Sequence, residues 1–81
     1  MRLPRDVSGD ELIKRLRKVD YKLTRSTGSH ARLTRASPKG EHHITVPLHK
    51  NLRAGTLNNI LTDVATHLKI SKQDLLDQLF S

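Results

Sequence analysis

The chain has 81 residues, no cysteine or tryptophan, and a formal net charge of +7 at pH 7. This length suits a single domain, residues 1–81, with a modest core, and the lack of cysteine excludes disulfides and thiolate metal sites. No segment approaches the roughly 20 apolar residues of a membrane span, and the first residues lack the apolar run of a signal peptide. We therefore expect a soluble, cytoplasmic protein.

The positive charge lies entirely in the first part of the chain. Residues 1–50 hold twelve of the 15 Lys and Arg and five of the 8 Asp and Glu, whereas residues 51–81 hold three of each kind. Such an asymmetry is typical of small domains that bind a polyanion, nucleic acid above all. A net charge of this size also keeps a small domain soluble, so the charge alone does not decide between nucleic-acid binding and solubility.

The first helix is predicted over residues 8–19. Ser8 is a good N-cap, and Glu11 three residues later completes a capping box. Val7 and Leu12 hold the two positions of a hydrophobic staple. Apolar residues then recur at helical spacing, at Leu12, Ile13, Leu16 and Val19.

Three strands follow, at residues 21–26, 29–36 and 42–47. Turn signals separate them: Thr27-Gly28 after the first, and the stretch SPKGE at residues 37–41 after the second. β-branched residues favour the third strand, and Pro47 marks its end because it has no amide to donate. Short turns between strands indicate an antiparallel meander.

Two further helices complete the order. One begins near Thr56 and continues to about residue 68, with apolar residues along one face, and a short one covers residues 71–80, with Ser71 as N-cap and Asp74 at the N3 position. The fold class is therefore α+β: a two-layer α-β-β-β-α arrangement in which helices cover one face of a three-stranded antiparallel sheet, plus a short C-terminal helix.

Strand alternation predicts which side chains lie on the face without helices. Tyr21 and Leu23 should face the helices. The opposite face should carry polar residues and no carboxylate: Lys22, Thr24, His30, Arg32, Thr34, His43 and Thr45. Arg25, Arg35 and Lys39 should lie near its edges. A polar face is the ordinary wet side of an antiparallel sheet, but its positive sign also suits a phosphate backbone.

The other histidines give no metal site by their spacing. His42 and His43 should point to opposite faces of the sheet, and the chain has no HxH or HExxH spacing. We expect no metal and no cofactor. His49 lies in a loop, where it can cap or contact a nucleic acid, and His67 near the end of a helix is expected to be structural.

The string SGDELIKRL, followed by YKLTRSTGSH, ITVPLH, LRAGTL and NNIL, resembles the HicA family of small toxins from bacterial and archaeal toxin–antitoxin pairs. The likeness runs from about Ser8 to Leu61. Its markers are Gly28-Ser29-His30 and the element Val46-Pro47-x-His49, which continues to Gly55-Thr56-Leu57. The chain departs from the family in having Leu33 where many members have an aromatic residue, and in its longer segment 62–81.

The resemblance implies a fold similar to the double-stranded-RNA-binding domain. It also implies an mRNA interferase that cuts mRNA, a HicB-like antitoxin as partner, and a catalytic histidine that falls on His30. We expect His30 to act as general acid or base without a metal, because RNA supplies its own nucleophile, the 2′-hydroxyl, and imidazole titrates near neutral pH. The residues expected to contact the RNA are Lys22, Arg25, Ser29, Arg32 and His43, with His43 also a candidate for the complementary acid.

Two alternatives stay open at this point. A non-catalytic RNA-binding module would use the same basic face for phosphate contacts alone. A protein-interaction domain would instead use the apolar stripe of the C-terminal helix, whose residues suit either a core or an interface: Leu75, Leu76, Leu79 and Phe80.

Overall fold

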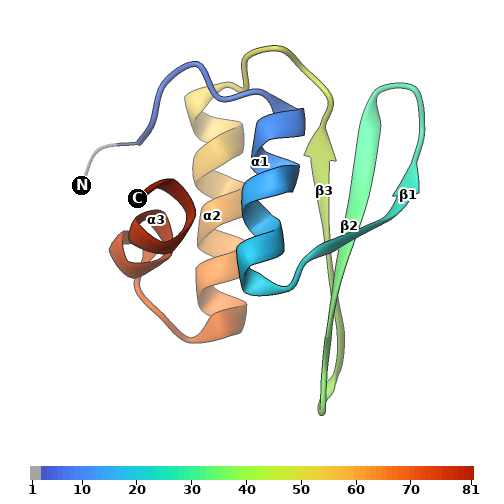
Figure 1. The fold of residues 1–81 in the computed structure, drawn as a ribbon, viewed down its shortest axis with the longest axis vertical. Coiled ribbons are helices and arrows are strands. Elements are labelled where there is room, and N and C mark those ends of the chain that lie inside the picture. The colour runs from blue at the N-terminus through green and yellow to red at the C-terminus, as the bar shows by residue number, and fades with distance from the viewer. Residues whose placement is uncertain (1–2) are drawn as a thin grey trace.

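A computed structural model describes residues 3–81. It confirms the α+β class, with the elements in the order α1 (Gly9–Leu16), a 3-10 turn η1 (Arg17–Val19), β1 (Lys22–Ser26), β2 (His30–Ser37), β3 (Gly40–Pro47), α2 (Ala54–Leu68) and α3 (Lys72–Phe80) (Figure 1). The three strands form one antiparallel sheet in the order β1-β2-β3.

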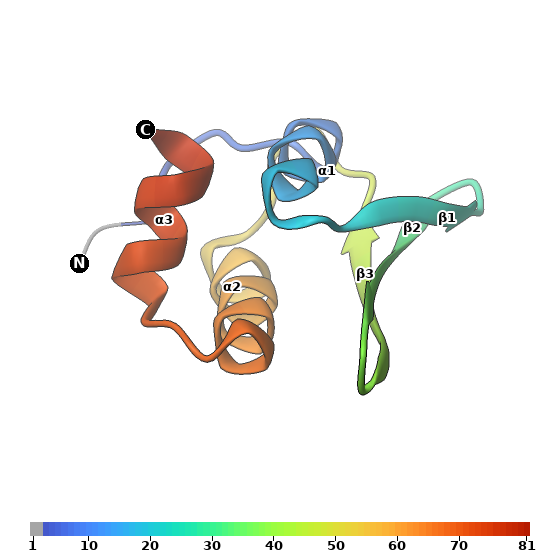
Figure 2. The ribbon, with the colours of Figure 1, turned by 60° about the horizontal axis from the view of Figure 1, so that its bottom comes forward.

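The helices lie on one side of the sheet. α1 and α2 pack against it, and α3 lies on the far side of these two helices (Figure 2). Apolar side chains from the three helices, β2 and β3 form one buried cluster, which includes Leu12, Leu16, Leu33, Val46, Leu57, Leu61 and Val64. The opposite face of the sheet carries no helix, so its side chains are open to solvent.

The start of α1 follows the predicted capping signals. The Ser8 hydroxyl accepts the Glu11 amide at 3.0 Å, and Val7 and Leu12 are both buried. The regular helix ends at Leu16, three residues earlier than expected, because the chain tightens into η1 and then turns at Asp20, which has a φ of 70°. The Tyr21 amide closes this end on the Leu16 carbonyl at 3.1 Å.

The start of α2 was predicted wrongly. The helix begins at Ala54 with Arg53 as N-cap, two residues before Thr56. The Leu57 amide donates to the Arg53 carbonyl at 2.9 Å, so the first helical bond forms upstream of the threonine. Gly55 has open space around it and does not interrupt the helix. α3, by contrast, begins as predicted, since the Ser71 hydroxyl accepts the Asp74 amide at 3.0 Å.

The apolar stripe of α3 belongs to the core. Leu75 and Leu79 are fully buried and Leu76 is 6% exposed. Arg15 of α1 stacks over the Phe80 ring at 4.6 Å and donates to the Leu79 carbonyl at 2.8 Å. Lys18 Nζ donates to the same carbonyl at 3.4 Å, so two basic side chains satisfy an acceptor that the helix end leaves without an intrahelical partner. The stripe is therefore occupied within this chain and is not a free docking surface.

The N-terminus of α1 touches the end of β3 through a glycine. The Gly9 amide donates to the His49 carbonyl at 3.0 Å, and a Cβ at Gly9 would overlap the Pro47 carbonyl oxygen. Both neighbours are backbone atoms, which cannot swing away as a flexible side chain can. Only glycine fits this contact without moving the helix.

We expect Gly9→Ala to lower the free energy of unfolding by about 1–3 kcal/mol, the usual cost of overpacking a filled site. Gly55→Ala is the matched control, because its Cβ would enter open space in a helix and should stabilise by about 0.5–1 kcal/mol. Urea unfolding followed by circular dichroism measures both. Equal stability of Gly9→Ala and the parent would contradict the close contact.

Candidate functional site

His30 is the first residue of β2 and is exposed on the sheet face without helices. It pairs with Pro47 at the end of β3. Its Nδ1 lies 2.9 Å from the Ser29 hydroxyl. This contact engages Nδ1 and leaves Nε2 as the ring nitrogen that can face a bound substrate.

The turn that carries His30 is tied down on both sides. The Thr27 amide donates to the His30 carbonyl at 2.8 Å, which closes the hairpin between β1 and β2. The Leu48 amide donates to the Ser29 carbonyl at 2.8 Å. The two motifs at residues 28–30 and 46–49 therefore meet in space, and the histidine is presented from an anchored backbone.

The register of β2 and β3 separates the two histidines of this face. His43 pairs with Thr34, four residues along β2 from His30, which corresponds to roughly 13 Å between their backbones. His43 Nδ1 contacts the Thr34 hydroxyl at 2.8 Å, and its Nε2 lies 3.7 Å from Glu41. The two histidines share a face as predicted, and this separation does not favour His43 as the complementary acid at the same phosphate.

The expectation of a carboxylate-free face is also wrong. β3 begins at Gly40 and not at residue 42, so Glu41 belongs to the strand and pairs with Ala36 on the same side as His43. Glu41 and Asp20 line a hollow on this face together with Lys22. Lys22 thus lies on the predicted face but beside two carboxylates, which weakens its pull on a phosphate.

A β-bulge in β1 changes where Arg25 points. Lys22 and Leu23 pair with Thr34 and Leu33 in simple alternation, but the next pair is Arg25 with Arg32, and Thr24 is the extra residue. Strict alternation put Arg25 on the side of Leu23, near the edge of the polar face. The bulge brings it onto that face, directly across from Arg32.

Leu23 faces the side of the helices, as predicted, but it is not covered. It is 46% exposed, because β1 extends beyond the helical layer (Figure 2). Tyr21, just before β1, is fully buried.

A second group of histidines lies beneath the sheet. The Tyr21 hydroxyl bonds to His42 Nδ1 at 2.7 Å, His42 Nε2 lies 3.2 Å from Asp63, and the rings of His42 and His67 stack with centroids 4.1 Å apart. Pattern reasoning placed His42 on the inner side and took His67 as structural, but it did not find their contact, since nothing in the spacing of residues 42 and 67 indicates it.

Two members of this partly buried group, Tyr21 and His67, have shifted pKa values. Burial raises the pKa of Tyr21 to about 12, with Asp63 adding to the rise and Arg35 opposing it. Burial also lowers the pKa of His67, helped by the nearby charges of His42 and Arg35 and opposed by Asp63. The Nε2 atom of His67 is buried without a hydrogen-bond partner, which fits a neutral ring. The group therefore lies packed between the sheet and α2.

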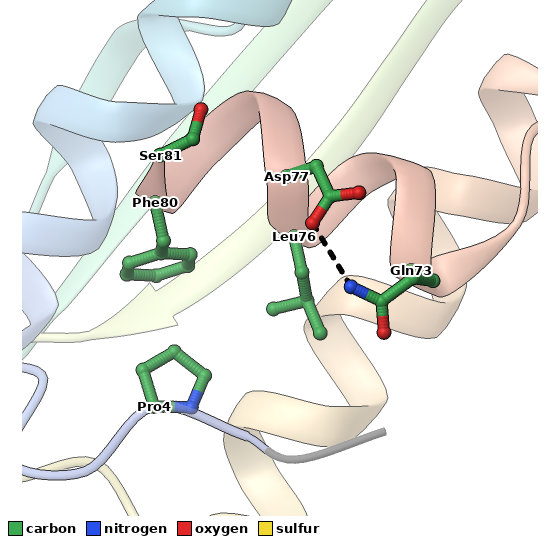
Figure 3. Close-up of a pocket in the computed structure, with 6 residues that line it drawn as sticks. All are labelled: Pro4, Gln73, Leu76, Asp77, Phe80 and Ser81. Atoms are coloured by element: carbon green, nitrogen blue, oxygen red, sulfur yellow. Dashed lines mark hydrogen bonds between the residues drawn. The ribbon is translucent and has the colours of Figure 1, made fainter.

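The hollow in Figure 3 lies at α3, which is on the far side of α1 and α2 from the sheet (Figure 2). Its walls come from Pro4 and the last turns of α3, including Leu76 and Phe80, and its one drawn polar contact joins Gln73 to Asp77 at 2.9 Å. No histidine lines it. Within residues 3–81, no three His, Asp or Glu side chains gather as metal ligands, and no helix is long and apolar enough to cross a membrane.

The family model described as "HicA toxin of bacterial toxin-antitoxin" matches residues 9–65. This span includes α1, the whole sheet and most of α2, and it contains His30 with both of its anchoring segments. None of the curated proteins and none of the solved structures matches the chain significantly.

The ionisation of Tyr21 gives a direct test of its burial. The chain has one tyrosine and no tryptophan, so phenolate absorbance reports Tyr21 alone. Its folded pKa exceeds the unfolded value, so this contribution to stability is complete below about pH 10 and is lost as the pH rises toward about 12. We expect phenolate to form near pH 12 if the chain stays folded. If it forms at a lower pH, the circular dichroism signal of the fold should be lost at the same time. Ionisation near pH 10 in a folded chain would contradict the burial.

His67 should make the fold sensitive to acid. Its folded pKa lies below the unfolded value, so its contribution is present above about pH 6.5 and is lost as the pH falls below it. His67→Phe keeps a ring against His42 and removes this titration. We expect its melting temperature to fall less than that of the parent between neutral and mildly acidic pH. His49→Ala, in an exposed loop, is the control that should keep the parent's slope, and an unchanged slope in His67→Phe would contradict the assignment.

Proposed function

Because the chain belongs to the HicA toxins of bacterial toxin–antitoxin systems, we propose that it is an endoribonuclease, an mRNA interferase that cuts mRNA with His30 and so inhibits translation. The observation that carries the proposal is the placement of His30: exposed, anchored on both sides, and on the basic end of the open sheet face. A HicB-like antitoxin in the same cytoplasm would be its partner.

The chemistry needs little beyond a positioned proton carrier. The 2′-oxygen of the RNA attacks the adjacent phosphorus, so a P–O2′ bond forms while the P–O5′ bond breaks. The 2′-hydroxyl gives up a proton and the departing 5′-oxygen gains one. His30 Nε2 performs one of these two transfers, while the Ser29 hydroxyl holds the other ring nitrogen. The products are a 2′,3′-cyclic phosphate and a 5′-hydroxyl.

The charged surroundings suit the phosphate. Arg32 lies two residues from His30 on the same face, where its guanidinium can hold phosphate oxygens by charge-assisted hydrogen bonds. These bonds strengthen as negative charge builds up on the phosphorane, which is how such a residue lowers the barrier. Lys22 and His43 lie farther along the face, next to Glu41 and Asp20, so they serve RNA binding at a distance from the cut.

We expect His30→Ala to lower the cleavage rate by about 10²- to 10⁴-fold, the usual contribution of an acid–base group, while RNA binding persists. His43→Ala is the matched control, since it removes a histidine from the same face but roughly 13 Å away, and it should lower the cleavage rate far less than His30→Ala does. The assay follows a labelled RNA on a denaturing gel, with EDTA present, beside growth after induction in cells.

A deoxynucleotide at the cut position tests the nucleophile. Without its 2′-hydroxyl the RNA should resist cleavage at that position. Cleavage of the deoxy substrate at the full rate would exclude the mechanism. Growth arrest by His30→Ala equal to that of the parent would favour a module that blocks RNA by binding alone.

A further inference from the structure

The bulge in β1 places two guanidinium groups side by side. Arg25 pairs directly with Arg32 across the strands, and Thr24 occupies the extra position beside them. Arg25, Arg32, Thr24 and Thr34 line one hollow on the open face of the sheet. The Thr24 and Thr34 hydroxyls contact each other at 2.8 Å, which ties the bulged residue to β2.

This arrangement costs stability in the free protein. Like charges directly opposite each other on neighbouring strands repel, and here both side chains are exposed. Across residues 3–81 neither guanidinium forms an ion pair. β-bulges are a recurrent device for re-aiming a side chain next to an active site. A bulge that sets two unpaired arginines together therefore points to an anion as the missing partner.

We propose that Arg25 and Arg32 form a phosphate clamp, built by the Thr24 bulge, that holds the RNA strand beside His30. The proposal rests on the proposed function, because it assigns the clamp to the RNA that His30 cuts. Arg32 lies roughly 7 Å along β2 from His30, so the clamped phosphate is the scissile one or its neighbour. Two guanidinium groups match the oxygens of one phosphate by paired hydrogen bonds.

The surroundings favour a nucleic-acid backbone over an acidic protein segment. Protein interfaces have an apolar centre, whereas this face has none. Of the residues that the structure describes, Leu23 is the large apolar side chain that is exposed, and it lies on the opposite side of the sheet. The clamp also reads no base edges, so it should bind RNA of any sequence and leave sequence preference to other contacts.

Glu41 limits the clamp at one end. It lines the same hollow, on the side of His43 and away from His30. A phosphate is attracted by the arginines and repelled by this carboxylate. The strand of RNA should therefore cross the sheet at the end that bears the hairpin of residues 27–29, next to His30.

The test moves one arginine to the other face of the sheet and keeps the net charge of the protein. Ser26 pairs with Ala31, whose side chain is buried on the side of the helices, so Arg25→Ser combined with Ser26→Arg transfers one guanidinium to the other face and keeps the net charge of +7. The variant is made in a His30→Ala background, which prevents cleavage. Binding of a short fluorescein-labelled single-stranded RNA is measured by fluorescence anisotropy over a series of salt concentrations.

We expect the exchange to weaken RNA binding on the order of tenfold and to reduce the salt slope by up to about 0.7, because one cationic contact to the RNA backbone is lost. Arg25→Gln should also weaken RNA binding and reduce the salt slope. This single variant replaces the double variant if circular dichroism shows that the double variant does not fold. Arg17→Ser is the control, since it removes an exposed arginine beside Leu23 and should weaken binding less.

Two results overturn the clamp, and they distinguish failure of the clamp alone from failure of the proposed function. Unchanged affinity in both Arg25 variants, with weakened binding in Arg32→Gln, excludes the clamp but leaves an RNA-binding face. If the unaltered chain, with His30 in place, neither binds nor cleaves RNA, the clamp and the proposed function are both excluded.

Discussion

The segment that follows β3 joins the helical layer to the hairpin that carries His30. Its backbone bonds in three directions: Leu48 to Ser29 at 2.8 Å, His49 to Gly9 at 3.0 Å, and Leu52 to Val7 at 2.8 Å. A backbone bond between anchored segments fixes position better than a side-chain contact, because it leaves no rotamers to explore. The same short stretch therefore sets where α1 begins and where the exposed histidine stands, which links the packing of the core to the geometry of the site.

The two faces of the sheet show how one domain keeps its histidines apart. On the inner face, His42 and His67 stack beneath the strands with Tyr21 and Asp63, and burial favours the neutral form of His67. On the outer face, His30 is open to solvent beside two arginines. A half-buried ring whose neutral form is favoured suits packing, whereas an exposed ring is free to meet a bound substrate. The environment of each histidine, and not its presence, separates the two roles.

Local signals in the sequence predicted most of the fold, and non-local pairing explains where they fell short. The capping residues Ser8 and Ser71 act within one turn of helix, so their effect can be read from a few neighbours. The bulge at Thr24 and the early start of β3 depend on which residues the strands meet across the sheet. Those two features decide that Arg25 and Glu41 lie on the open face. Alternation therefore placed His30 and Arg32 correctly and misjudged the charges around them.

The C-terminal helix explains how so small a domain is held together. The family match ends at residue 65, inside α2, so α3 lies outside it. α1 and α2 each pack one side against the sheet. In a domain of this size the opposite sides of these helices stay exposed unless another element covers them. α3 supplies this cover with Leu75, Leu76 and Leu79, and α1 closes its end through Arg15. The sheet is thereby free to keep its other face uncovered, and an uncovered face is what a site for a long, flexible polyanion requires.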